Sequence, residues 1–105
     1  MTTEKLNQMT VSTKANVYFD GKCVSHSLTA ADGTQLSVGV VLASELRFST
    51  GAAEIMECSA GSCEYRLAGT EQWLTSTAGE KFSIPANSYF DIKVAEAYHY
   101  ICHYA

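Results

Sequence analysis

From residue 16 onward, short runs of β-branched and aromatic residues alternate with breaks of glycine, aspartate or asparagine, at intervals of about ten residues. This spacing is typical of β-strands joined by turns, and no segment shows a helical pattern of useful length. Tight turns are predicted at 30–33 and at 59–62, where glycine accommodates the backbone. The predicted strands, roughly eight to ten in number, include 22–29, 34–42, 54–58, 63–67, 72–76, 81–84, 89–94 and 98–104.

So many strands must close on themselves or stack as two sheets, because an open sheet would leave long unpaired edges. A chain of 105 residues has room for one hydrophobic core only. We therefore predict an all-β fold, a single-domain jelly-roll β-barrel over residues 15–105. Residues 1–14 are rich in Thr, Ser, Asn, Gln and Lys without a hydrophobic period, and are predicted to form a flexible N-terminal arm.

The composition narrows the class of partner. Apolar residues make up 47% of the chain and charged residues 17%, which excludes disordered, collagen-like and coiled-coil proteins. The 7 basic residues are scattered among 11 acidic ones, so neither a nucleic acid nor an anionic membrane surface is an expected partner. An anionic small molecule stays possible, because a site needs only a few local donors.

The cysteines and the first residues predict a cytoplasmic protein. Residues 1–10 lack the basic and apolar segments of a secretion signal, and no apolar run is long enough to span a bilayer. Cys58 and Cys63 are spaced neither as a redox pair nor as half of a zinc site. We expect the cysteines to be reduced and to fill small apolar spaces within strands.

The last predicted strand, 98–104, indicates a partner subunit. Tyr100 and Cys102 lie on one of its faces, and His99 and Ile101 lie on the other. Neither face is plainly polar, so both are expected to be covered. A small domain can cover only one face of such a strand with its own core, so the other face is expected to be covered by a partner subunit. The sequence therefore predicts a homodimer, since a two-fold dimer is the commonest such arrangement.

One spacing of residues resembles the first cupin motif: Gly39, Glu45, Arg47, Glu54 and Gly61. Glu45 and Arg47 occupy the two histidine places of that motif, and Glu54 occupies its glutamate place. In cupins these places point into the barrel and hold a metal. Two carboxylates beside a guanidinium are a poor ligand set for Zn²⁺ or Fe²⁺, so no metal is predicted. Alternatively, Glu45 and Arg47 form an exposed ion pair on one strand face.

The second cupin motif is echoed by Gly79 and Pro85, with Phe90 standing roughly where its histidine would be. Seven segments taken in order are similar to the pyrimidine/purine nucleoside phosphorylase family, whose members are small single-domain cupins. The segments are 18–22, 39–41, 45–50, 54–56, 78–82, 84–90 and 100–104.

The resemblance implies a cupin-type barrel that phosphorolyses nucleosides with wide tolerance of the base. Inorganic phosphate would attack C1′ of the ribose and release the free base and ribose 1-phosphate, without a metal or an organic cofactor. The expected partners are therefore a nucleoside and inorganic phosphate. The alternative is a non-enzymatic cupin that binds a small metabolite or serves in assembly.

The same resemblance implies roles for particular side chains. Glu45 and Glu54 would hold ribose hydroxyls or stabilise positive charge on the sugar, and Arg47 would bind phosphate with two hydrogen bonds. The remaining candidates are Lys22, Thr50 and Ser88 for phosphate, Met56, Phe90 and Tyr100 for a wall against the base, and Asn87 for a base carbonyl or a sugar hydroxyl.

Several of these side chains have a simpler alternative. Thr50 precedes a glycine and could shape a turn, and Asn87 and Ser88 are equally suited to a loop. Lys22 could be a solvated lysine at the start of a strand. Tyr100 could belong to the core or to a subunit interface.

Overall fold

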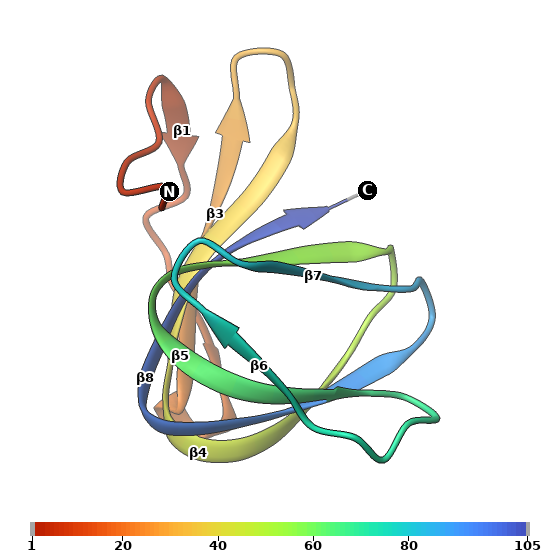
Figure 1. Ribbon diagram of the computed structural model, residues 1–105. Helices are drawn as coiled ribbons and strands as arrows, with labels where there is room; N and C mark the ends of the chain where they lie inside the picture. Colours follow the sequence, from red (N-terminus) through yellow and green to blue (C-terminus); the bar gives the residue numbers. More distant parts are fainter. Residues whose placement is uncertain (1, 105) are drawn as a thin grey trace.

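The computed structural model describes residues 2–104 and confirms an all-β, cupin-type jelly-roll barrel in a single domain (Figure 1). The described chain contains no helix that is long and apolar enough to cross a membrane. Its elements are β1 (Met9–Val11), β2 (Asn16–Tyr18), the 3-10 turn η1 (Phe19–Gly21), β3 (Cys23–Ala30), β4 (Gln35–Ser49), β5 (Glu54–Leu67), β6 (Leu74–Thr77), β7 (Lys81–Ile84) and β8 (Tyr89–Tyr104).

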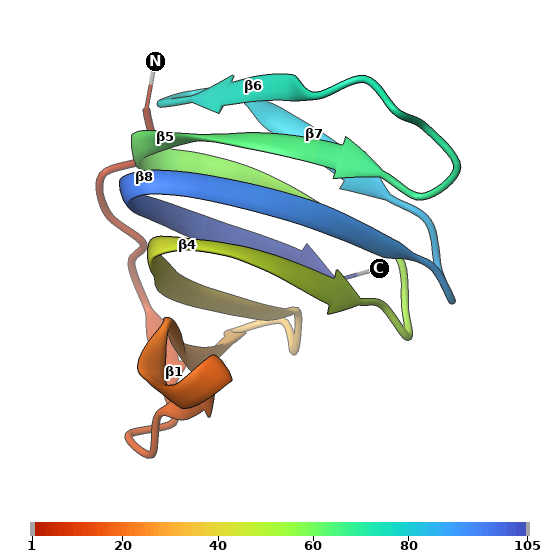
Figure 2. The same ribbon diagram turned by 90° about the horizontal axis from the view of Figure 1, so that it is seen from below.

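Three strands of 14 to 16 residues, β4, β5 and β8, carry the architecture. The sheet order is β1-β3-β4-β8-β5-β6, with β2 on β3 and β7 on β5, and every pairing is antiparallel. Each long strand curves around the barrel, so that its two halves lie in opposite walls (Figure 2). The first half of β5 pairs with β7, and its second half pairs with β6.

Register shifts produce this curvature. They lie between Leu42 and Ser44 in β4, and between Cys58 and Ala60 and between Gly61 and Glu64 in β5. An extra residue on one strand bends it and increases its twist. The predicted turn at 59–62 is therefore wrong: this segment is an irregular part of the continuous strand β5.

The other predicted turn, at 30–33, is confirmed. It joins β3 and β4 as an antiparallel hairpin. The amide of Ala30 donates to the carbonyl of Thr34, and Gly33 has a φ of +88°, which glycine adopts without strain. The side chain of Asp32 accepts the amide of Thr34 at 3.0 Å.

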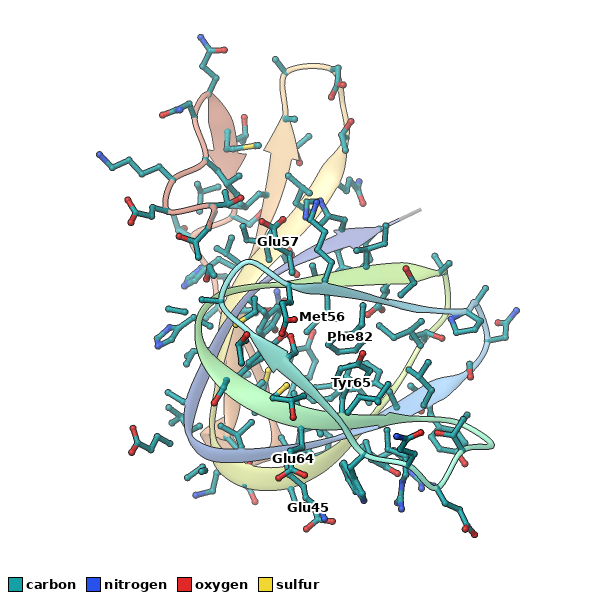
Figure 3. All side chains as sticks on the ribbon, viewed as in Figure 1. Glu45, Met56, Glu57, Glu64, Tyr65 and Phe82 are labelled. Carbon is teal, nitrogen blue, oxygen red and sulfur yellow. The ribbon has the colours of Figure 1, made fainter. Side chains whose placement is uncertain are left out.

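The core fills the inside of the barrel. Its side chains come from the strand faces that the alternation of residues along each strand predicts to point inward. Along β8, Phe90, Ile92 and Val94 all point inward and are buried. Stacked aromatic rings join the two walls: the Tyr65 and Phe82 centroids are 3.8 Å apart, and Phe82 meets Phe90 edge-on at 5.7 Å. Figure 3 shows Tyr65, Phe82 and Met56 inside the barrel. All four cysteines are free and buried, as expected for small fillers.

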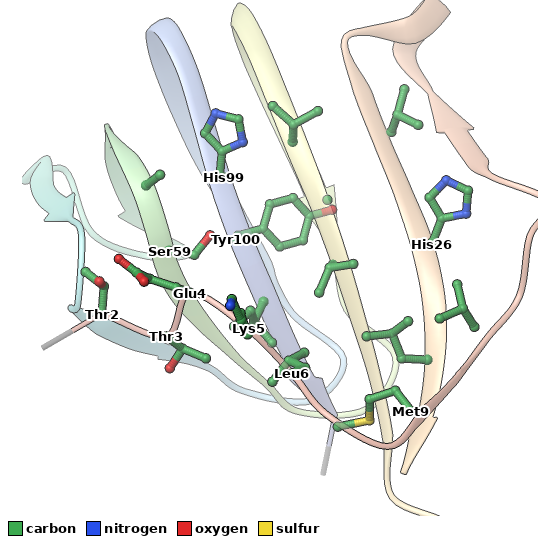
Figure 4. A pocket seen from close by; sticks show the side chains of 18 residues that line it. Thr2, Thr3, Glu4, Lys5, Leu6, Met9, His26, Ser59, His99 and Tyr100 are labelled. Atoms are coloured by element: carbon green, nitrogen blue, oxygen red, sulfur yellow. The ribbon is translucent and has the colours of Figure 1, made fainter.

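The described part of the N-terminal arm lies against the outside of the sheet. β1 pairs with β3, and Thr3 donates a hydrogen bond of 2.5 Å to Glu57. Leu6 and Met9 pack on a second apolar cluster of Leu28, Leu36 and Ile101. A groove of about 870 Å³ runs between this arm and the sheet, with His26, His99 and Lys5 at its edges (Figure 4). The division of the chain at residue 14 stays a prediction.

Candidate functional site

The barrel encloses a cavity of about 150 Å³, lined by side chains from β2, β3, β4, β5 and β8. Four of the residues predicted for a site line it: Glu54, Met56, Phe90 and Tyr100. Pockets for small molecules usually measure about 300–1,000 Å³. The interior can therefore enclose part of a nucleoside-sized ligand, and the rest must lie at the mouth.

The strand register brings the polar groups of this cavity together. Gly39 lies opposite Tyr100 on the neighbouring strand, and Glu54 lies opposite Tyr104. A Cβ atom at Gly39 would lie 2.7 Å from the hydroxyl of Tyr100, so only glycine lets this ring cross β4. The Tyr100 hydroxyl thereby comes within 3.5 Å of the Cys23 sulfur on β3.

Hydroxyl groups dominate the polar lining. The Ser37 and Tyr104 hydroxyls share a hydrogen bond of 3.0 Å, and Ser25 also lines the cavity. Burial raises the pKa of Tyr104 to about 12 and also raises the pKa of Tyr100. These phenols stay protonated at neutral pH, so each offers both a donor and an acceptor.

Glu54 is the one carboxyl among the described residues that line the cavity. It is half-buried and accepts a weak hydrogen bond from the Cys102 thiol at 3.5 Å. Burial raises its pKa above the ordinary value of 4.5, because the apolar surroundings disfavour the ionised form. A carboxyl with a raised pKa is suited to giving a proton to a leaving group.

Glu45 and Arg47 do not point into the barrel, and the expectation taken from the cupin motif is wrong on this point. Before the bulge at 42–44, the odd-numbered Ser37 and Val41 face inward; after it, the even-numbered Leu46 and Phe48 pack against the core. The register shift between Leu42 and Ser44 reverses the faces of β4. Glu45 is therefore exposed on the outside, as Figure 3 shows.

The outward side chain of Arg47 belongs to an ion-pair network. Its Nε lies 2.7 Å from one Asp91 oxygen, and Arg66 donates to the other at 2.9 Å. The Arg47 guanidinium also lies 4.1 Å from the centre of the Tyr89 ring. The alternative of an exposed ion pair thus describes Arg47 well, but its partner is Asp91 and not Glu45.

Asp91→Asn is expected to lower the free energy of unfolding by about 2 kcal/mol and Tm by roughly 10 °C, because hydrogen bonds to the charged carboxylate are lost. The hydrogen bond from Arg47 is the main cause that holds the pKa of Asp91 below 3.8. A lowered pKa means that this stability is present above pH 3.8 and is lost as the pH falls through the folded-state pKa. Thermal unfolding at neutral and at acid pH measures both effects.

Glu64→Gln, a change of an exposed carboxyl, serves as the control for Asp91→Asn. It should leave Tm within about 2 °C of the unchanged protein. Equal Tm values for Asp91→Asn and the unchanged protein at pH 7 would contradict the prediction, and so would a difference that does not shrink as the pH is lowered below 3.8.

Thr50, Asn87 and Ser88 hold two loops together beside the mouth. The Thr50 hydroxyl donates to the Pro85 carbonyl at 2.7 Å and accepts the Ser88 amide at 2.9 Å. The amide of Asn87 donates to Gly51, and Asn87 adopts a φ of +54°. These contacts fit the alternative of loop-shaping residues. Their roles in ligand binding stay predictions, as does that of Lys22, whose exposed side chain lies outside the cavity lining.

The sequence reasoning missed Ser25, Ser37, Tyr18 and Tyr104 as lining residues. Tyr104 could have been predicted from the alternation of side chains along the last strand, because Tyr104 shares a face with Tyr100. Ser37 shares the face of Gly39 in the same way.

Across residues 2–104, no group of three or more His, Cys, Asp or Glu side chains is arranged to hold a metal ion. His103 instead contacts Glu57 at 2.9 Å on the outside of the sheet, and His26 contacts the Ser12 carbonyl at 3.0 Å. The absence of a metal from the reaction stays a prediction.

The proteins that this chain resembles identify its family. The pyrimidine/purine nucleoside phosphorylase family model matches residues 13–104. A pyrimidine/purine nucleoside phosphorylase of Delftia acidovorans is 70% identical over 105 residues, which cover all of both chains.

Two solved structures resemble the fold. A protein of unknown function from Acinetobacter sp. ADP1 superposes with a TM-score of 0.94 at 37% identity, covering 96% of this chain and 98% of that one. A putative ethanolamine utilization protein from Salmonella typhimurium has a TM-score of 0.66 at 14% identity, covering 90% and 94%, which shows likeness of fold alone. The match over 13–104 and the full-length relative confirm the sequence-based assignment: this chain belongs to the pyrimidine/purine nucleoside phosphorylase family.

Proposed function

We propose that this protein is a metal-independent nucleoside phosphorylase that accepts both purine and pyrimidine nucleosides. The observation that carries the proposal is the barrel interior, where Glu54, with its raised pKa, shares the cavity lining with several hydroxyl groups. The full-length relative named pyrimidine/purine nucleoside phosphorylase supports the reaction type. The family name and the lining together favour an enzyme over a binding or assembly cupin.

In the proposed reaction, an oxygen of inorganic phosphate forms a bond to C1′ of the ribose as the bond from C1′ to the base nitrogen breaks. The electron pair of the broken bond stays on the base, which takes the proton of the Glu54 carboxyl. The products are the free base and ribose 1-phosphate, and Glu54 regains a proton from solvent. The hydroxyls of Ser25, Ser37 and Tyr100 would bind the sugar against Met56 and Phe90, so that in this proposal Met56, Phe90 and Tyr100 contact the sugar instead of forming the predicted wall against the base.

Broad base tolerance follows from what the lining offers. The lining hydroxyls that are not assigned to the sugar, those of Ser49 and Tyr104 among them, rotate and serve as either donor or acceptor, so they do not distinguish a carbonyl from an amino group. No amide or cationic side chain is among the described lining residues, and such groups would read a base edge in a fixed orientation. The site therefore has little with which to reject one class of base.

We assign phosphate to the rim of the cavity, because the described lining holds no cationic side chain. Lys22 follows η1, whose Phe19 packs on the lining residue Phe48. Ser88 lies beside Thr50, which follows the lining residue Ser49. Arg47 is outside the barrel and has no part in this assignment. Metal independence is supported by the replacement of both motif histidines by residues that face outward.

A homodimer in the cytoplasm is part of the proposal. The outer sheet face carries the half-buried Val24, Val38 and Val40 beside the 870 Å³ groove, a surface suited to a second copy (Figure 4). The four free cysteines fit a reducing compartment. Light scattering after size-exclusion chromatography tests the dimer, and a monomer at micromolar concentrations would contradict it.

The activity is tested by incubating the purified protein with uridine or adenosine, with and without phosphate, in the presence of EDTA. Chromatography should detect free base and ribose 1-phosphate from both nucleosides, and only when phosphate is present. A known nucleoside phosphorylase serves as the assay control. Absence of phosphate-dependent base release would leave the non-enzymatic binding cupin as the better description. Loss of activity with EDTA would overturn metal independence alone.

A further inference from the structure

A strained turn borders the cavity mouth. η1 places three successive residues in the left-handed region, with φ values of +52° for Phe19, +54° for Asp20 and +89° for Gly21. Glycine accepts this region freely and aspartate tolerates it, but a bulky residue such as phenylalanine rarely does. Such strain persists only where the surrounding structure enforces it, and it is common at ligand sites.

The turn is fixed to the barrel by Phe19. Its ring meets Phe48 edge-on at a centroid distance of 5.3 Å, and Phe48 in turn stacks on Phe90 at 5.5 Å. Phe90 and Phe48 both line the cavity. The strained turn is therefore packed against the wall of the cavity, and its geometry is tied to that of the site.

This packing leaves Tyr18 available to a ligand. Tyr18 lines the cavity and is nevertheless 47% exposed, although it is a large aromatic residue. Within the described chain, it has neither an aromatic ring partner nor a side-chain hydrogen bond. An exposed aromatic face at a cavity mouth is a surface for a flat, apolar ligand group.

We propose that Tyr18 is the stacking platform for the nucleobase, held in place by the left-handed turn that follows it. This inference rests on the proposed function and adds to it how the base is held. The interior of about 150 Å³ is too small for a whole nucleoside, so part of the substrate must lie at the mouth, where Tyr18 is. Every base has a π face, so stacking holds purines and pyrimidines alike without reading their edges.

Binding of the free bases tests the platform independently of phosphorolysis. Uracil and adenine are titrated into the full chain by calorimetry, without phosphate. Tyr18→Ala should weaken the binding of both bases about tenfold, whereas Tyr18→Phe, which keeps the ring, should bind them within about twofold of the unchanged protein. Val17→Ala is the matched control, because Val17 is the adjacent residue of β2, is 62% exposed and is absent from the lining.

Three results would contradict the role of Tyr18 as a stacking platform. They are an unchanged affinity of Tyr18→Ala for both bases, a weakened affinity for only one of the two bases, and no binding of either base by the unchanged protein. If the protein binds bases through Tyr18 but releases none from nucleosides, the proposed reaction fails and the platform stands. If phosphorolysis occurs and Tyr18→Ala keeps its KM for both nucleosides, the platform fails alone.

The role of the turn is measured with Gly21→Ala. A Cβ at Gly21 meets nothing within 4 Å, so the change acts only through its φ of +89°. Displacing Tyr18 should raise the KM for uridine and adenosine several-fold with little change in kcat. Gly33→Ala, at a φ of +88° in the β3–β4 hairpin and equally free of contacts, imposes the same backbone strain away from the site and should leave KM unchanged. Equal KM values for the two variants would contradict a positioning role for the turn.

Discussion

Replacing Glu54 by glutamine is expected to lower kcat for uridine phosphorolysis about 100-fold or more, with the barrel still folded. Glutamine has nearly the same size and keeps a hydrogen-bonding group, but it has no proton to give to the departing base. Glu54 is the one carboxyl among the described lining residues, so no neighbour there can take over its role. Steady-state rates with saturating phosphate, beside circular dichroism spectra, measure the effect.

The stability of Glu54→Gln should change in the opposite direction to its activity. Burial raises the pKa of Glu54 in the folded protein above the 4.5 of an unfolded chain. The folded state then binds the proton more tightly, so the unchanged protein loses stability as the pH rises from 4.5 through the raised pKa. Glutamine carries no charge to bury, so Tm of the variant should be equal or higher at pH 8, and its advantage should vanish below pH 4.5.

Glu45→Gln provides the matched control for this experiment. Both glutamates are predicted from the sequence as catalytic, but Glu45 is exposed on the outside of the barrel. Its replacement should leave kcat within about twofold of the unchanged protein. Equal losses in both variants would contradict an interior site, and a full rate in Glu54→Gln would remove Glu54 from the reaction.

The alternation of side chains predicts much of the interior. The inward faces of 89–94 and 98–104 follow from the period of two along a strand. The same rule fails at Glu45 and Arg47, because β4 and β8 change register between Leu42 and Ser44, where β8 advances by three residues and β4 by two, and the inward face of β4 changes there. The sequence around Ala43 contains neither glycine nor proline, so nothing local signals this bulge. A local pattern cannot reveal it, since the bulge depends on pairing with β8 far along the chain.

The strands predicted from the sequence are shorter than those of the structure for a related reason. The break at 59–62 has the composition of a turn, and residues 95–97 contain no β-branched or aromatic residue, but these segments lie inside β5 and β8. Continuous strands of this length are stable because β8 pairs along its length with β4 on one side and with β5 on the other. That support comes from residues distant in sequence, which a window of ten residues does not contain.

The motif spacing was informative where it concerned the backbone. Gly39 and Gly61 occupy the glycine places of the cupin-like motif, and each lies where a side chain would meet another strand. The two histidine places, in contrast, carry residues that face outward here. The spacing therefore predicted the barrel and the position of Glu54, while the chemistry of a metal site did not follow from it.

Gly61→Ala is expected to be the most damaging single change to the fold, with a loss of about 3–5 kcal/mol. Gly61 has a φ of +78°, which disfavours any side chain, and a Cβ there would overlap the carbonyl oxygen of Ala97 in β8. The obstacle is backbone held in a strand pairing, so it cannot move aside as the end of a flexible side chain would. Denaturant and thermal unfolding should show a Tm lower by about 15 °C or more, whereas Gly51→Ala, whose Cβ would meet nothing within 4 Å, should stay within about 3 °C. Equal stability of the two variants would show that β5 can shift at Gly61, and the bulge would then not be what fixes the bend of β5 around the barrel.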